Sequence, residues 1–472
     1  MNNRFFDIFH VSEEQLRSLT AQALGSGGSW CDLYFENTFN SELVLRDSQV
    51  SSGGFHSDYG CGIRVLNGDR TGYAYSESTD AAALRAAAAA AAAIACGGAA
   101  GAAPAQIRPL SAPPRYRAVK DWRAADPSEL VPVLEKLEAS IRRRDSRVVK
   151  VLAVLASQTT EVLMYNSLGE LTTDFRPLAS LAVSVIFRSG DKTESQSASV
   201  SFRMGAEMLS DALIEDLADK AVRGIDERFE ARRPKGGKMS VVMGAGASGI
   251  LLHEAMGHAF EADFNRKGQS VFSEKMGKKV CRSGINIVDD GTIEGNRGSL
   301  TFDDEGVPGQ KTYMVEDGVL RSYLHDRISA SYYGVAPTGN GRRESFRYNP
   351  IPRMRATYME SGTDGTREDI IASVRKGIYV DQFANGEVKI GEGDFTFYVR
   401  SGFLIENGRL TMPVKDINII GNGPKALADI EAVGCDLALD NGSWTCGKEQ
   451  SAPVCCGIPT VLVKNLTVGG AQ

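Results

Sequence analysis

The sequence is short of the features that mark several large protein classes. Lys and Arg number 53 against 59 Asp and Glu, a net charge of −6. A chain without a basic excess is a poor candidate for direct nucleic-acid binding, which needs a cationic face. The longest apolar stretch, near residues 86–96, is mostly alanine and about half the length that spans a bilayer, and the first ten residues carry no signal-like apolar run. We therefore expect a cytoplasmic protein with no membrane and no direct nucleic-acid partner.

Cysteine and histidine are also scarce. The eight cysteines include no CxxC pair and are far too sparse for a disulfide scaffold, which favours free thiols in a reducing compartment. Histidine occurs only five times, at His10, His56, His253, His258 and His325. Two of the five lie within six residues of each other, and this clustering is the most unusual feature of the composition.

The patterns that are present predict an α+β protein of two domains. A mixed α/β N-terminal domain is expected over residues 1–236 and a mostly antiparallel, β-rich C-terminal domain over residues 237–472. The basic, glycine-bearing segment 232–237 marks the boundary. A buried strand at 239–243 leads into an apolar central helix at 248–260. Farther on, glycine-containing turn pairs separate alternating runs, with one helical interruption at 367–376.

Local signals place the N-terminal elements. Ser12 and Gln15 form a capping-box pattern at the start of a helix. Further helices are expected at 79–96, 126–144 and 207–229, with a Gly/Ala/Pro-rich linker at 97–114. Turns at 52–54 and 67–69 are expected to separate short strands. Separate strands are also expected at 148–156, 160–166, 171–175, 178–187 and 194–202.

The central helix contains the clustered histidines. His253, Glu254 and His258 stand in an otherwise apolar segment, where polar groups require partners. Neutral imidazole is a good zinc ligand, and a carboxylate beside the metal can take a proton from water. The segment therefore predicts a zinc site with His253 and His258 as ligands and Glu254 as the catalytic base.

The five-residue separation of the histidines is unusual. At about 100° per residue, positions 253 and 258 differ by about 140° around a regular helix, so their side chains would diverge. A π-type bulge or a helix end at Gly257 would bring them together, and we predict such an irregularity. The competing interpretation is a pair of partly buried histidines bonded to the backbone.

A zinc site needs a third protein ligand, which the spacing does not identify. Glu261 and Asp263 follow the motif directly and could ligate the metal or support its ligands. His325 and the C-terminal cysteines are the other candidates, because only the fold decides which distant side chain comes close.

The segment from His253 to residue 262 (HEAMGHAFEA) resembles the HExxxH segment of the TldD/PmbA proteins, once described as modulators of DNA gyrase. Further segments resemble the family in the same order along most of the chain. They are 302–306 (FDDEG), 323–327 (YLHDR), 337–343 (PTGNGRR), 404–408 (LIENG), 420–424 (IGNGP) and 466–470 (LTVGG).

This resemblance implies a zinc metallopeptidase with two histidine ligands, one cysteine ligand and a catalytic glutamate. The family's cysteine stands in a Cys-Gly-Lys segment before the terminal Leu-Thr-Val-Gly-Gly, which makes Cys446 the third ligand beside His253 and His258. A departure is Cys455-Cys456, where the family has small apolar residues; we interpret these as buried substitutions, with a shifted ligand assignment as the alternative.

The resemblance also implies partners. Relatives with the motif are TldD-like and form homodimers, or heterodimers with a TldE/PmbA-like chain, around an inner cavity for extended peptides. The leading hypothesis is thus a Zn2+-dependent peptidase acting on short or unfolded polypeptides. The alternative is a non-catalytic peptide-binding or regulatory module with a structural zinc. A gyrase-associated factor acting on DNA is the third and weakest hypothesis, given the charge of −6.

Overall fold

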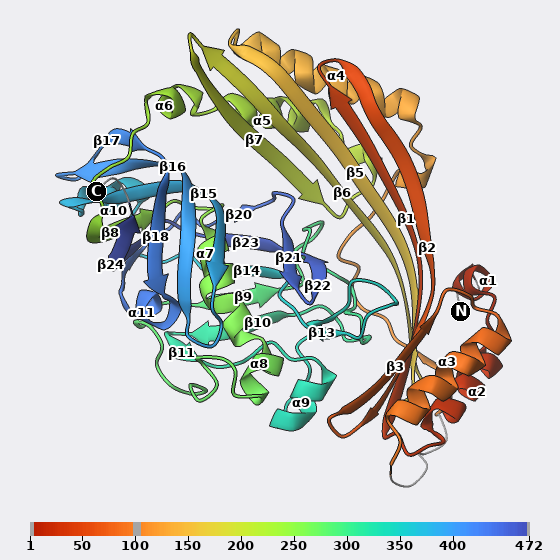
Figure 1. Cartoon of the computed structure of the whole chain (residues 1–472). Coiled ribbons are helices and arrows are strands. Elements are labelled where there is room, and N and C mark those ends of the chain that lie inside the picture. Colours follow the sequence, from red (N-terminus) through yellow and green to blue (C-terminus); the bar gives the residue numbers. More distant parts are fainter. Residues whose placement is uncertain (1–3, 98–104, 470–472) are drawn as a thin grey trace.

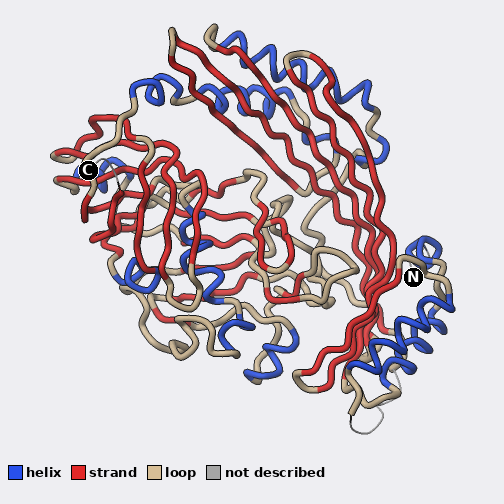
Figure 2. Tube along the Cα trace, in the orientation of Figure 1, coloured by secondary structure: helices blue, strands red, loops and turns tan. Residues whose placement is uncertain are grey.

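The N-terminal half of the protein is a long curved sheet that arches over a β-rich C-terminal body, as a computed structural model shows (Figure 1). The structure describes residues 4–97 and 105–469, so part of the expected linker lies outside the described residues. The α+β class is confirmed. Figure 2 shows how far the bowed strands of the arch extend beside the shorter strands of the body.

The arch is a mainly antiparallel sheet in the order β3-β2-β1-β5-β6, with β7 on the outer side of one half of β6 and β4 on the other. Its strands are β1 (Trp30–Arg46), β2 (Gln49–Asn67), β3 (Arg70–Ser76), β4 (Arg108–Pro109), β5 (Val148–Asn166), β6 (Glu170–Ser189) and β7 (Lys192–Phe202). The accompanying helices are α1 (Arg4–Phe9), α2 (Glu13–Leu24), α3 (Ala81–Ile94), α4 (Pro127–Arg144), α5 (Asp211–Val222) and α6 (Ile225–Glu230).

Alternation along the strands gives the arch two different faces. On β5, Ala153 and Leu155 pack under α4 and α5, while Leu163 packs under α2 and α3. Val162 and Met164 point to the opposite face, toward the C-terminal body. Because successive strand residues point to opposite sides, the helices cover one face at both ends and leave the concave face for the body.

Several N-terminal expectations are confirmed. Ser12 and Gln15 form the capping box of α2, and α4 begins at Pro127. The alanine-rich helix is α3. The expected turn at 52–54 is wrong, since Gly53 and Gly54 pair with Leu43 and Glu42 inside β2.

Other expected boundaries are also wrong. The runs 148–156 and 160–166 form one strand, as do 171–175 and 178–187, because cross-strand pairing continues through the polar residues between them. The helix expected at 207–229 is divided into a short 3-10 turn, α5 and α6. Gly224, with φ of 79°, adopts the left-handed conformation that breaks it.

The C-terminal body contains two main sheets. The first has the order β11-β10-β9-β14-β23-β20, and the second has the order β15-β8-β24-β18-β16-β17, with β15 also pairing with β16 so that the sheet closes on itself. Most pairs are antiparallel; β15–β8 and β14–β23 are parallel. The strands are β8 (Gly237–Met243), β9 (Ile287–Asp290), β10 (Lys311–Glu316), β11 (Val319–Leu320), β12 (Gly341–Arg342), β13 (Ile351–Pro352), β14 (Ala356–Met359), β15 (Lys376–Val388), β16 (Asp394–Glu406), β17 (Arg409–Val414), β18 (Ile417–Asn422), β19 (Ile430–Val433), β20 (Ala438–Asp440), β21 (Thr445–Lys448), β22 (Gln450–Pro453), β23 (Cys455–Ile458) and β24 (Val461–Gly469).

The body has more helical segments than the single interruption expected at 367–376. The helices are α7 (Gly249–Leu252), α8 (Ala262–Arg266), α9 (Arg327–Tyr333), α10 (Arg367–Ala372) and α11 (Gly423–Ala428). The central segment that begins with α7 contacts β14 and β23 of the first sheet and β15 and β16 of the second. It therefore lies between the two sheets, inside the largest apolar core.

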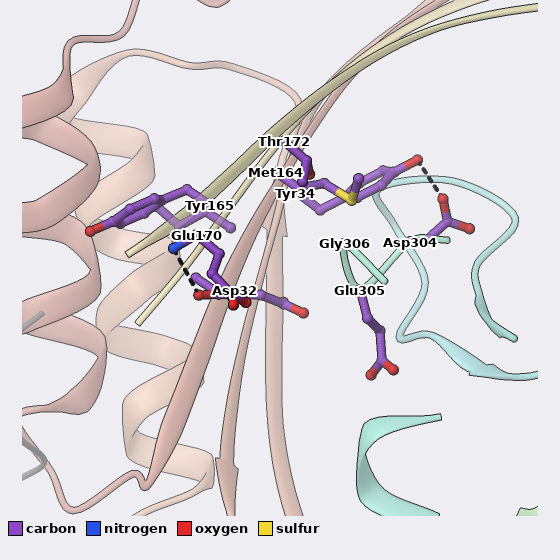
Figure 3. A pocket seen from close by; sticks show the side chains of 11 residues that line it. Asp32, Tyr34, Met164, Tyr165, Glu170, Thr172, Asp304, Glu305 and Gly306 are labelled. Carbon is purple, nitrogen blue, oxygen red and sulfur yellow. Dashed lines mark hydrogen bonds between the residues drawn. The ribbon is translucent and has the colours of Figure 1, made fainter. Parts of the chain in front are cut away.

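Buried charges join the arch to the body. Arg64 on β2 donates to Asp32 on β1 at 2.6 Å and to Glu305 of the body at 2.7 Å, and its side chain is fully buried. In Figure 3, Tyr34 of β1 points toward Asp304. The Tyr34 hydroxyl donates a hydrogen bond to the Asp304 carboxylate, with 3.4 Å between the two oxygens. Removing one partner from a buried ion pair is costly, so the ion pairs of Arg64 fix how the concave face meets the body.

Candidate metal centre

The two motif histidines are brought together by an irregular helix. α7 is followed by a π-helical turn at His253–Gly257 and a 3-10 turn at His258–Phe260. The His258 N–H donates to the His253 carbonyl, which is the five-residue bond of a π turn. The two imidazole rings are 5.2 Å apart between centroids. The predicted irregularity is confirmed.

Gly257 contributes space rather than unusual backbone geometry. Its φ of −57° is ordinary for a helix. A Cβ at this position would stand 2.1 Å from Met354 Sδ, a contact that no real Cβ makes. The close packing of Met354 against the bulge therefore requires the absence of a side chain.

Cys446 reaches the same point from a different element. It lies on β21, which pairs with β22 as a short hairpin. Its Sγ is 3.1 Å from His258 Nε2. One donor atom from each of His253, His258 and Cys446 falls within 4.8 Å of the others, and all three residues are buried. The structure thus brings together the three residues that the sequence analysis singled out as ligands.

The electrostatics of this trio favour the thiolate. Burial alone would disfavour the charged sulfur, but the adjacent His253 and His258 imidazoles hold the pKa of Cys446 down to about 4. A thiolate is the form in which cysteine binds a metal. The imidazoles beside Cys446 therefore favour the form of its sulfur that binds a metal.

One buried carboxylate supports both ligand-bearing segments. Glu261 Oε2 lies 2.9 Å from His258 Nδ1, which leaves the Nε2 atom facing Cys446. The same oxygen accepts from Lys448, two residues after Cys446, at 3.0 Å. Despite complete burial, Lys448 and His258 hold the pKa of Glu261 down to about 2. Glu261 is therefore an anion that orients the imidazole and anchors the hairpin.

Arg353 strengthens this anchor. Its guanidinium donates to the carbonyls of Cys446 and Gln450 at 2.6 Å each, and its Nε lies 3.9 Å from Glu261 Oε1. Sequence reasoning did not identify Arg353 or the role of Lys448. Only the Lys of the Cys-Gly-Lys segment carried a signal, because it is part of the family pattern.

Glu254 differs from the ligands in being accessible. Its side chain is 24% exposed, and Oε2 is 3.9 Å from His258 Nε2. The carboxylate therefore lies beside the donor cluster without being one of its buried members. This is a suitable position for exchanging protons with a bound molecule.

The other ligand candidates are engaged elsewhere. Asp263 accepts from Lys448 at 2.8 Å, and Cys455 Sγ contacts the Asp440 carbonyl at 3.2 Å. His325 packs against Tyr323 and Tyr333, and burial lowers its pKa to about 4. In the described part of the chain, none of these joins the cluster of three donors.

The donor set suits zinc. Two imidazoles and one thiolate are nitrogen and sulfur ligands of the type zinc prefers, and a three-residue set is typical of a catalytic site. His253 Nδ1 is buried without a hydrogen-bond partner among the described residues. A buried polar group left alone is costly, so an imidazole without such a bond is consistent with a ligand role.

Two cavities border the Cys446 hairpin where the body meets the concave face. One of about 740 Å³ is lined by Thr445 and Ser451 of the hairpin and by Ser180 of β6. The other, of about 730 Å³, is lined by Trp444 and by Ser184 of the same strand. Both cavities therefore lie between β6 of the concave face and the segment around the Cys446 hairpin.

Three family models match separate parts of the chain. The PmbA/TldA metallopeptidase C-terminal domain matches residues 236–470. Domain 1 of the same metallopeptidases matches residues 31–95, and their central domain matches residues 120–227. The two N-terminal matches contribute strands to one sheet, the arch.

Curated relatives are metalloproteases. The chain is 40% identical to the metalloprotease TldD homolog of Haemophilus influenzae, over 94% of this chain and 93% of the relative. It is 37% identical to the homolog of Buchnera aphidicola from Acyrthosiphon pisum, over 98% and 96%. A zinc metalloprotease TldD homolog of Saccharolobus solfataricus is 33% identical over 62% of this chain and 65% of the relative.

Solved structures share the fold. TldE from Thermococcus kodakarensis superposes with a TM-score of 0.75 at 19% identity, covering 97% of this chain and all of the other. A Thermotoga maritima protein considered a candidate modulator of DNA gyrase gives a TM-score of 0.74 at 23% identity, covering 97% and 99%.

No described helix is long and apolar enough to cross a membrane.

Proposed function

The chain belongs to the PmbA/TldD family of metallopeptidases, and on this premise we propose that it is a zinc-dependent peptidase that hydrolyses peptide bonds in short or unfolded polypeptides. The observation that carries the proposal is the convergence of His253, His258 and Cys446 beside the accessible Glu254. A buried donor set next to a partly exposed carboxylate matches the needs of hydrolysis rather than of a structural metal.

His253, His258 and Cys446 are the residues that would hold zinc. The metal supplies a Lewis acid that lowers the pKa of water and polarises a carbonyl group. Glu254 takes the proton from the attacking water and delivers it to the leaving amine. Glu261 keeps the His258 ring oriented during both transfers through the Nδ1 contact at 2.9 Å.

The surroundings of the site support an extended substrate. The cavities beside the hairpin are open clefts whose walls combine serines with apolar side chains such as Phe55 and Val183. An extended peptide can be held there mainly through its backbone, which permits varied sequences.

We propose that the partner chain is a second copy or a TldE/PmbA-like protein, and that the protein acts in the cytoplasm.

The rival function is a peptide-binding or regulatory module with a structural zinc. It requires a fourth protein ligand, for which Asp263 and Cys455 were the candidates. Asp263 is paired with Lys448, and Cys455 contacts the Asp440 carbonyl. The accessible position nearest the donors belongs to Glu254, which favours the catalytic function.

The test is a Glu254→Gln protein assayed on unstructured peptides, with zinc content measured on the same sample. We expect zinc and peptide binding to persist while the cleavage rate falls by about 10²- to 10⁴-fold, the usual contribution of a general base. Glu274→Gln, which alters an exposed carboxylate on the same domain, is the matched control. Undiminished cleavage by Glu254→Gln would rule out this mechanism.

A further inference from the structure

A cluster of cations lines a cavity of about 250 Å³ between α5, α6 and the closed sheet of the body. We call it the basic pocket; its cations are Lys220, Arg223, Arg228, Arg367, Arg400 and Lys415. Two carboxylates, Glu227 and Asp381, also line it. In a chain whose net charge is −6, such a local excess of positive charge needs an explanation.

Part of this charge is not neutralised by the protein. Glu194 pairs with Lys415 and lies 3.6 Å from Arg228, while Lys220 pairs with Asp216 and Arg367 with Glu368. Among the described residues, no carboxylate lies within 4.0 Å of Arg223 or Arg400. Arg400, half-buried, donates to the Ser197 hydroxyl, and its own carbonyl accepts from Arg228.

Arg228 and Arg400 are neighbours in the pocket wall. Arg228 Nε is buried without a hydrogen-bond partner among the described residues. Burial and the neighbouring Arg228 charge both lower the pKa of Arg400, so the two guanidinium groups disfavour each other's charge. Adjacent cations are stabilised when an anion enters.

The basic pocket is continuous with the cleft beside the candidate metal centre. Lys220, Arg223, Gln382 and Arg400 line both the basic pocket and the 730 Å³ cavity. That cavity extends to the loop 245–247 before α7 and to Trp444, two residues before Cys446. A chain lying in the cleft can therefore run from the cations toward the segments that lead into α7 and the Cys446 hairpin.

We propose that the basic pocket binds acidic side chains of the polypeptide substrate, outside the bond that is cleaved. This rests on the proposed peptidase function and adds a substrate preference to it: unfolded segments that carry Asp or Glu at a distance from the cleavage point. Guanidinium groups suit this ligand because they bind carboxylates through paired hydrogen bonds.

The test uses full-length Glu254→Gln protein, so that bound peptides stay intact, and two fluorescent peptides of equal length with amidated ends. One carries a glutamate run and the other the same run as glutamine. We expect the glutamate peptide to bind about tenfold more tightly, as the loss of a charge-assisted hydrogen bond would predict. Added salt should weaken only this preference.

Substitution of Arg223 and Arg400 by glutamine should remove the preference, leaving the glutamine peptide unaffected. The matched control replaces Arg375 and Arg409, two exposed cations of the body outside the pocket, by glutamine. A variant with lysine at positions 223 and 400 should still prefer the glutamate peptide, because the positive charges remain. This variant distinguishes a loss of charge from a loss of folding. Equal binding of the two peptides, or an equal loss in the control, would overturn the proposal.

Two further measurements separate the alternatives. If inorganic phosphate at low millimolar concentration displaces the glutamate peptide completely, the pocket is a small-anion site and the proposal is wrong. Cleavage of the glutamine peptide by unaltered protein tests the peptidase function independently. If the protein binds the glutamate peptide through Arg400 but cleaves neither peptide, the basic pocket binds acidic side chains and the proposed peptidase function is wrong.

Discussion

Cys446 Sγ lies 3.1 Å from His258 Nε2, although 188 residues separate the two along the chain. The histidine belongs to a bulged helix between two sheets, and the cysteine belongs to a hairpin at the rim of the cleft. The donor set is therefore a product of tertiary structure, and it can be tested one residue at a time.

Replacement of Cys446 by serine should abolish zinc retention. A neutral hydroxyl is a much weaker zinc ligand than a thiolate, so we expect affinity to fall by more than the roughly 10- to 100-fold seen when only a supporting residue is lost. Metal analysis after dialysis measures the effect. Cys435→Ser, which changes an exposed free thiol, is the control. Unchanged zinc in Cys446→Ser would remove this residue from the ligand set.

Glu261→Gln should weaken the metal site without removing a ligand. Glutamine can still accept one hydrogen bond, but it lacks the charge that holds His258 and Lys448. We expect zinc affinity to fall by about 10- to 100-fold. The absorption spectrum of the cobalt-substituted protein should also shift, because the imidazole is less firmly oriented. An unaltered affinity and spectrum would show that Glu261 has no positioning role.

Glu36 should make stability depend on pH at the junction of arch and body. Burial raises the pKa of this carboxyl to about 7, even though Thr38 and the Phe346 N–H donate to it. Its folded pKa lies above the ordinary value of 4.5, so its stabilising contribution is complete below pH 4.5 and is lost as the pH rises through 7.

Glu36→Gln should therefore remove part of the destabilisation on going from pH 5 to pH 8. The pKa difference of Glu36 between the folded and unfolded protein corresponds to roughly 3 kcal/mol of unfolding free energy at most. Denaturant unfolding of both proteins at the two pH values measures it, and the difference between them isolates Glu36 from other titrating groups. A parallel pH dependence in the two proteins would contradict this assignment.

The sequence allowed the elements with strong local signals to be predicted. The side chains of Ser12 and Gln15 each accept a hydrogen bond from the other residue's backbone N–H. Because both residues lie within one helical turn, this capping box needs no contact with distant parts of the chain. The bulge near Gly257 followed from helix geometry alone, since two ligands five residues apart cannot share a face of a regular helix. Both features are local, and both were predictable.

The errors arose where distant pairing outweighs local preference. Gly53 and Gly54 are typical turn residues, yet pairing with β1 keeps them extended. Ser157, Gln158 and Thr159 interrupt the apolar residues of β5 in the sequence, yet they pair with β1 and β6 within one strand. Arg353 could not be connected with Cys446 from sequence, because the contact joins residues that only the folded body brings together.

The distance between the donors along the chain has a consequence for timing. Ribosomes add about 5–20 residues per second, so the thiol is made some 10 to 40 s after the imidazoles. During that interval the growing polypeptide contains the two histidines and Glu254 but lacks their sulfur neighbour. The proposed metal site would thus be incomplete until the hairpin that carries Cys446 docks on Glu261.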